Sequence, residues 1–120
     1  KPVDASHSLE RFDREAFEKY YEKNDELMKL IMIEFAHQLS EFEEEIQQLA
    51  QEGNWDQLKH TSHKLRGSAS ATHMQKLIDL TLKIEDGKTK GEEELDALMD
   101  ELITEIKSAQ HITRDFVKSV

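Results

Sequence analysis

The sequence lacks cysteine and contains one proline and four glycines in 120 residues. Without cysteine the chain can form neither a disulfide framework nor a thiolate metal site. So few helix-breaking residues leave long uninterrupted segments, which favours an all-helical protein. No apolar run approaches the roughly 20 residues of a membrane-spanning helix, and residues 1–8 have no apolar signal segment. We therefore expect a cytoplasmic protein with no direct membrane contact.

Positive charge is also in short supply. The chain has 16 lysines and arginines against 26 acidic residues, for a net charge of −10. Nucleic acids and anionic membranes reward basic surfaces, so neither is expected as a partner. The hydrophobic fraction of 37% is large enough for one core, and the length fits one domain. We expect residues 1–8 to be a linker or tail and residues 9–120 to form the domain, either free-standing or within a larger protein.

The spacing of apolar residues predicts helices, because these residues recur every three or four positions. A short first helix is expected from Leu9 to Lys23, packed across one end of the others. The second is expected from its N-cap Asn24 to about Gln51. Their predicted core-facing residues are Phe12, Ala16, Phe17 and Tyr20 in the first, and Leu27, Ile31, Phe35, Leu39, Phe42, Ile46 and Leu49 in the second.

Three further helices are predicted from capping signals. These signals are Gly53 and Asn54 with Gln57, Thr72 with Gln75, and Thr89 with Glu92 after the polar connection Gly87 to Gly91. The predicted core-facing residues are Trp55, Leu58, Ser62, Leu65 and Ala69, then Met74, Leu77, Ile78, Thr81 and Ile84, then Leu95, Leu98, Leu102, Ile106, Ala109 and Phe116. Short connections make successive helices antiparallel. The predicted fold class is all-α, an antiparallel up-down-up-down four-helix bundle with an additional short N-terminal helix.

The segment SHKLRGSAS, from Ser62 to Ser70, is the most informative part of the chain. It places a histidine, a cation and a glycine on consecutive turns of the third helix. A glycine inside a helix costs roughly 1 kcal/mol relative to alanine. The missing side chain at Gly67 therefore indicates that something bulky approaches His63, and the nearby positive charge indicates an anion.

The direction of His63 follows from helix geometry. At about 100° per residue, His63 lies roughly 130° from the centre of the core-facing stripe, on the water side. Lys59, Lys64 and Arg66 surround it, and Ser70 lies two turns along. This acidic chain thus gathers cations around one exposed imidazole, which suits a phosphate.

Glu85, on the fourth expected helix, is a candidate partner of His63. If the third and fourth helices reverse near Met74, His63 lies eleven residues before the turn and Glu85 eleven residues after it. The two side chains would then sit at the same height. Glu85 could accept a hydrogen bond from Nδ1–H of His63 and leave the Nε2 lone pair free to attack. The alternative is that Glu85 is an ordinary surface charge.

The run from His63 to Ala69, HKLRGSA, resembles the signature of histidine-containing phosphotransfer (HPt) domains of multistep phosphorelays. In that signature a histidine is followed by any residue, an aliphatic residue, a lysine or arginine, a glycine and small residues. The likeness extends to Phe12-Asp13-Arg14-Glu15-Ala16, to Gly53-Asn54-Trp55, and to Leu77 and Glu85. One departure is His73, which stands where members of the family often carry a glycine.

The resemblance implies a phosphocarrier that accepts a phosphoryl group from a receiver-domain aspartate and passes it to another. By position, His63 is the phosphoacceptor, Arg66 a cation near the phosphoryl oxygens, Gly67 the gap for the partner and Glu85 the residue that orients the imidazole. Supporting residues are Lys59, Lys64, Ser68 and Ser70.

The implied partners are response-regulator receiver domains, with a hybrid sensor kinase as a further candidate. The domain is expected to be monomeric and to have no cofactor or metal of its own, with Mg²⁺ on the receiver. It has no nucleotide-binding motif, so it is not expected to be an enzyme in its own right.

Two alternatives remain open from the residues alone. His60, His63 and His73 with Glu85 could form a metal site, although bundle metal sites usually project into the core. The chain could also be a non-catalytic helical adaptor, although its histidine, cation and glycine are intact.

Overall fold

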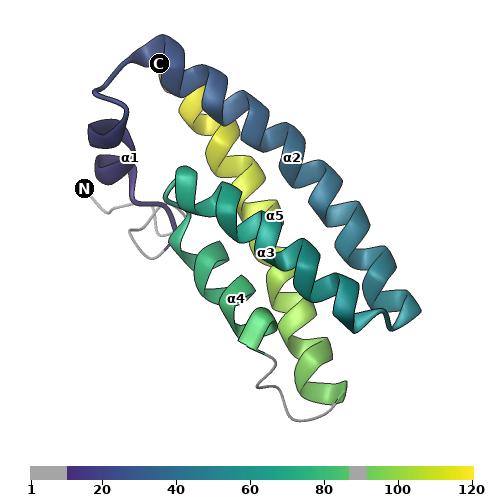
Figure 1. Ribbon diagram of the computed structural model, residues 1–120. Helices are drawn as coiled ribbons and strands as arrows, with labels where there is room; N and C mark the ends of the chain where they lie inside the picture. The colour runs from purple at the N-terminus through teal and green to yellow at the C-terminus, as the bar shows by residue number, and fades with distance from the viewer. Residues whose placement is uncertain (1–10, 87–91) are drawn as a thin grey trace, which may run out of the picture.

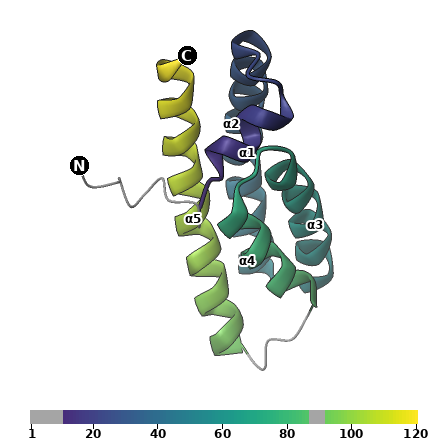
Figure 2. The ribbon, with the colours of Figure 1, turned by 90° about the vertical axis from the view of Figure 1, so that its left-hand side faces the viewer.

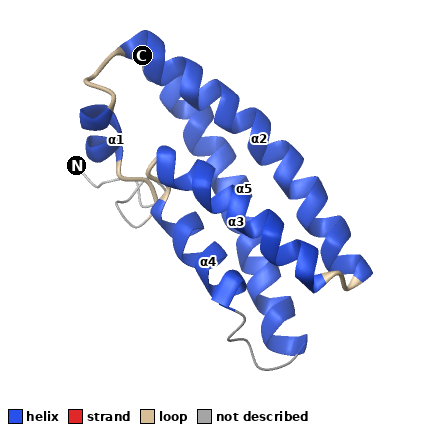
Figure 3. Ribbon diagram, viewed as in Figure 1, coloured by secondary structure: helices blue, strands red, loops and turns tan. Residues whose placement is uncertain are grey.

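The computed structural model describes residues 11–86 and 92–120, and its regular structure there is entirely α-helical (Figures 1 and 3). The helices are α1 (Arg14–Tyr20), α2 (Asp25–Glu52), α3 (Trp55–Ala71), α4 (Gln75–Asp86) and α5 (Glu92–Ser119). Neither of these ranges contains a helix that could span a membrane.

Helices α2 to α5 form the bundle. Each contacts two others, because α2 packs against α3 and α5, and α4 packs against α3 and α5. Two views at right angles show the four rods side by side, with α1 lying across the end where α2 begins and α5 ends (Figures 1 and 2). The predicted all-α bundle with an extra N-terminal helix is confirmed.

The first helix is shorter than its predicted span, Leu9 to Lys23. Helix α1 begins only after Asp13, whose side chain accepts a hydrogen bond from the Ala16 amide at 3.1 Å. It ends before Glu22 and Lys23, which both adopt positive φ and cannot continue a right-handed helix. Residues 9 and 10 lie outside the described part of the chain.

The core face of this N-terminal segment was predicted correctly except at Tyr20. Phe12 and Phe17 are buried and pack on Phe116 near the end of α5, with ring centroids 6.1 and 5.4 Å away. Tyr20 is instead 71% exposed. The next ring on the core side is instead that of Tyr21, which is partly buried against the core with its centroid 5.0 Å from that of Phe17.

The core stripe of α2 is also displaced at its start. Leu27 is 41% exposed and Ile31 only partly buried, whereas the neighbouring Met28 and Met32 are fully buried. Steps of four residues rotate by about 40° around a helix, so a stripe through Leu27, Ile31 and Phe35 drifts off one face. Alternating steps of four and three, as in Met28, Met32, Phe35 and Leu39, stay on it. Flexible methionine side chains suit such a seam.

Helix α3 begins and is oriented as predicted. Gly53 ends α2 in the left-handed conformation with φ 67°, and Asn54 caps α3 by accepting from the Gln57 amide at 3.3 Å. Four of the five predicted core-facing residues, Leu58, Ser62, Leu65 and Ala69, are buried, and Trp55 is partly buried. The face opposite this stripe is thereby turned to solvent.

The turn between α3 and α4 differs from the prediction. Thr72 is not the N-cap of α4, because its hydroxyl donates to the carbonyls of Ser68 and Ala69 at 2.9 and 3.2 Å and so closes α3. His73 then reverses the chain at φ 57°. The left-handed conformation explains why a glycine would suit this position, and it shows that the turn forms without one.

The His73 backbone gives a stability prediction. Replacing His73 with glycine or alanine removes the same ring contacts, but only alanine keeps a Cβ atom at positive φ. The His73→Gly variant should therefore be more stable than His73→Ala by about 1 kcal/mol. Chemical denaturation of the two variants measures this difference, and equal stabilities would show that the turn carries no such strain.

A buried hydroxyl on α3 gives a second stability prediction. The Oγ atom of Ser62 is fully buried and has no hydrogen-bond partner among the described residues. Ser62→Ala should raise the free energy of unfolding by about 1 kcal/mol, because it removes an unsatisfied polar group and improves helix propensity. The exposed Ser70→Ala is the matched control and should gain only the smaller propensity part. A Ser62→Ala variant that gains no more than this control would contradict the prediction.

Helix α5, from Glu92 to Ser119, completes the bundle. All of its predicted core-facing residues are buried, apart from Leu95, which is partly buried. The predicted polar connection Gly87 to Gly91, and the pairing of Thr89 with Glu92, fall outside the described residues or side chains.

Candidate functional site

His63 stands on the solvent face of α3, as its position on the helix predicted. Its side chain is 65% exposed, while its predecessor Ser62 is fully buried. The residue is held on a rigid rod, because the buried stripe of α3 faces the core on the other side. The ring is thus presented to the outside and not walled in by apolar side chains.

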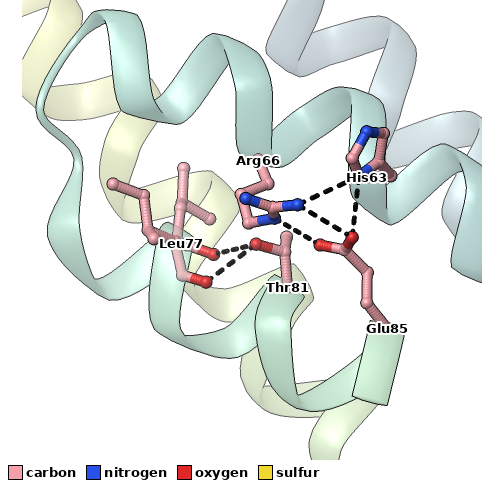
Figure 4. A network of polar contacts seen from close by, with 6 residues as sticks. His63, Arg66, Leu77, Thr81 and Glu85 are labelled. Carbon is pink, nitrogen blue, oxygen red and sulfur yellow. Dashed lines mark hydrogen bonds and ion pairs between the residues drawn. The ribbon is translucent and has the colours of Figure 1, made fainter. Parts of the chain in front are cut away.

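Glu85 on α4 reaches His63, at the height that the hairpin argument predicted. Its Oε1 atom lies 2.8 Å from Nδ1 of the imidazole. Its carboxylate also binds Arg66, with 2.6 Å from Nε to Oε2 and 3.2 Å from Nη2 to Oε1. Figure 4 shows these three side chains as one network between α3 and α4.

The contacts of Nδ1 determine which ring nitrogen carries the proton. Nδ1 lies 2.8 Å from Oε1 of Glu85 and 3.0 Å from Nη2 of Arg66. A carboxylate can only accept a hydrogen bond and a guanidinium can only donate one, so Nδ1 cannot satisfy both. The shorter contact, to an ionised oxygen, is the stronger hydrogen bond. We therefore assign Nδ1–H as the donor to Glu85, which leaves the Nε2 lone pair free.

Glu85 is ionised over the pH range in which this arrangement matters. Its side chain is 16% exposed. The hydrogen bonds from Arg66, and secondarily from His63, lower the pKa of the Glu85 carboxyl below its usual value, against the opposing effect of burial. The same hydrogen bond with Glu85 raises the pKa of Arg66. The carboxylate is thus a permanent acceptor for Nδ1–H near neutral pH.

Gly67 lies one turn beyond His63 on the exposed face. A Cβ atom placed there would have no heavy atom within 4 Å apart from the adjoining backbone. Packing inside the domain therefore does not require glycine at this position. The interpretation that the gap serves an approaching partner stays a prediction.

The supporting residues are placed as follows. Lys59, Lys64 and Ser70 are exposed, and Ser68 is half-buried. Within the two described ranges, Lys59 and Lys64 form no ion pair, whereas Arg66 is committed to Glu85. Of the three cations near His63, Arg66 is therefore bound to Glu85, whereas Lys59 and Lys64 remain available to a partner.

The histidines proposed for a metal site are not brought together. His73 lies in the α3–α4 turn beside Phe17, with ring centroids 6.4 Å apart, and His60 points to solvent. Among the residues that the structure describes, no three histidine or acidic side chains form a cluster that could hold a metal ion.

Sequence reasoning missed the ion pair between Arg66 and Glu85. In the hairpin register, Arg66 lies at the height of Leu82, three residues before Glu85. The register therefore did not predict a contact between Arg66 and Glu85. One helical turn is, however, within reach of a long arginine side chain. The contact could have been predicted from the acidic Glu85, which lies one helical turn from the position level with Arg66.

Comparison with known proteins agrees with this geometry. A family model described as "Hpt domain" matches residues 26–109, which includes His63, Arg66, Gly67 and Glu85. Searches of curated proteins and of solved structures found no match. The matched region covers well over half of the chain. The chain therefore belongs to the Hpt-domain family, the histidine phosphotransfer carriers of two-component signalling, which interact with the receiver domains of response regulators.

Proposed function

We propose that His63 is the phosphoacceptor of this domain. It takes a phosphoryl group from the aspartyl phosphate of one receiver domain and passes it to the aspartate of another. The observation that carries this proposal is the 2.8 Å contact between Nδ1 and Glu85 on an exposed ring, which leaves Nε2 unprotonated and facing solvent.

In the proposed step, the Nε2 lone pair attacks the phosphorus of the aspartyl phosphate in line with the bond that breaks. The Nε2–P bond forms, and the P–O bond to the aspartate breaks, so the receiver carboxylate leaves with the electron pair. Nδ1 keeps its proton throughout. Positive charge develops on the ring, and the ionised Glu85 stabilises it through the same hydrogen bond.

Other residues assist without taking part in bond changes. Lys59 and Lys64, which are exposed and unpaired in the described chain, attract the acidic phosphorylated face of the receiver. Gly67 leaves room for that face close to His63. The receiver contributes the Mg²⁺ ion that neutralises the phosphoryl oxygens. The domain itself needs only the nucleophile and the groups that position it.

Incubation with a panel of receiver domains carrying radiolabelled aspartyl phosphate tests the proposal. We expect at least one receiver to transfer label to the domain. The label should be lost in acid and stable in alkali, as expected of phosphohistidine and not of phosphoserine. Acid-stable label would contradict the proposal.

A further inference from the structure

We infer that Arg66 is a positioning residue that acts on His63 through Glu85, and not a ligand of the transferred phosphoryl group. This inference rests on the proposed phosphoacceptor role of His63. It reassigns the cation that the family signature places near the phosphoryl oxygens.

The guanidinium of Arg66 lies on the wrong side of the imidazole for a phosphoryl ligand. Nη2 is 3.0 Å from Nδ1, whereas the phosphoryl group would be attached to Nε2 on the other side of the ring. Figure 4 shows the second ring nitrogen of His63 pointing away from both Arg66 and Glu85. Arg66 therefore faces the proton-bearing edge of the ring and not its reacting edge.

Two nitrogens of Arg66 are already committed to Glu85. Nε donates to Oε2 at 2.6 Å and Nη2 donates to Oε1 at 3.2 Å. This two-point contact fixes both the rotation and the position of the carboxylate, as a single ammonium group could not. Oε1 is the oxygen that accepts the hydrogen bond from His63. Arg66 therefore fixes the position of the hydrogen-bond acceptor of His63.

The consequence concerns the protonation of His63 before any partner arrives. The hydrogen bond made by one ring nitrogen determines which nitrogen carries the proton. If Arg66 is removed, Glu85 loses two hydrogen bonds and is no longer held against Nδ1. A larger share of the neutral ring then carries its proton on Nε2, where it blocks attack. A cation that only binds phosphate would leave this balance unchanged.

The direct test is ¹⁵N NMR of the unphosphorylated domain, with Arg66→Ala compared with Lys64→Ala. Both changes remove one positive charge near His63, but only Arg66 is bound to Glu85. We expect the Nε2–H form of the neutral ring to increase clearly in Arg66→Ala and to stay at the wild-type level in Lys64→Ala. An unchanged proton position in Arg66→Ala would overturn the inference. Because no phosphoryl transfer is measured, this result is independent of the proposed function.

A double-mutant cycle provides the second test, on the rate of phosphoryl acceptance. We expect Arg66→Ala and Glu85→Ala each to slow acceptance about 10-fold, and the double variant to be slowed about 10-fold as well, because the two residues act as one unit. Slowing of about 100-fold in the double variant would show an independent contact of Arg66 with the phosphoryl group and would overturn the inference. Failure of the wild-type protein to accept label would instead count against the proposed function.

Discussion

Replacing His63 with glutamine should abolish phosphoryl acceptance, the largest effect expected of any single change. Glutamine retains a polar side chain of similar reach, but its amide nitrogen has no available lone pair for attack on phosphorus. The side chain is 65% exposed and belongs to none of the buried clusters, so the substitution should not disturb the fold. Labelling from a phosphorylated receiver should fall to background while the circular dichroism spectrum and unfolding midpoint stay close to wild type.

His60→Gln is the matched control for this experiment. His60 is also exposed, lies one turn before His63 on α3, and undergoes the same chemical change. It has no carboxylate on its ring in the described structure, so its loss should leave labelling at the wild-type level. Undiminished labelling of His63→Gln, or loss of labelling in His60→Gln alone, would show that the phosphoacceptor has been misassigned.

Replacing Gly67 with glutamine should slow phosphoryl transfer about 100-fold, since a displacement of the reactants by about 1 Å costs that much. The new side chain would project from the exposed face one turn from His63, where the receiver has to approach. The fold should tolerate it, because a Cβ atom at this position meets nothing within 4 Å and glutamine has a better helix propensity than glycine. Stability should therefore rise or stay the same while transfer slows.

The smaller substitution Gly67→Ala separates crowding from other causes. It gives a gain in helix stability of about 1 kcal/mol, at least as large as that of glutamine, but adds only a methyl group. Transfer should therefore be much faster in Gly67→Ala than in Gly67→Gln. If the glutamine variant transfers at the wild-type rate, the gap above Gly67 has no role in docking.

The central part of the site was predictable from the sequence because it depends on regular geometry. The direction of His63 follows from its offset to the buried stripe of Leu58, Leu65 and Ala69, which persists over several turns. The height of Glu85 follows from counting residues on both sides of a tight helical hairpin. Both arguments use only rise and rotation per residue, and the structure confirms both positions.

The features that the sequence did not predict depend on details that such counting ignores. The first helix is limited by its cap at Asp13 and by positive φ at Glu22 and Lys23, which a periodic pattern does not register. The start of α2 offered two overlapping apolar stripes, and only packing against other helices selects Met28 over Leu27. The attachment of Arg66 to Glu85 depends on the reach of two long side chains.

The most direct test of this account is NMR of the phosphorylated, ¹⁵N-labelled domain, in which phosphorus–nitrogen coupling identifies the atom that carries the phosphoryl group. The account predicts coupling to Nε2 of His63, with Nδ1 of the same ring still protonated. Coupling to Nδ1 of His63, or to a nitrogen of any other histidine, would contradict it.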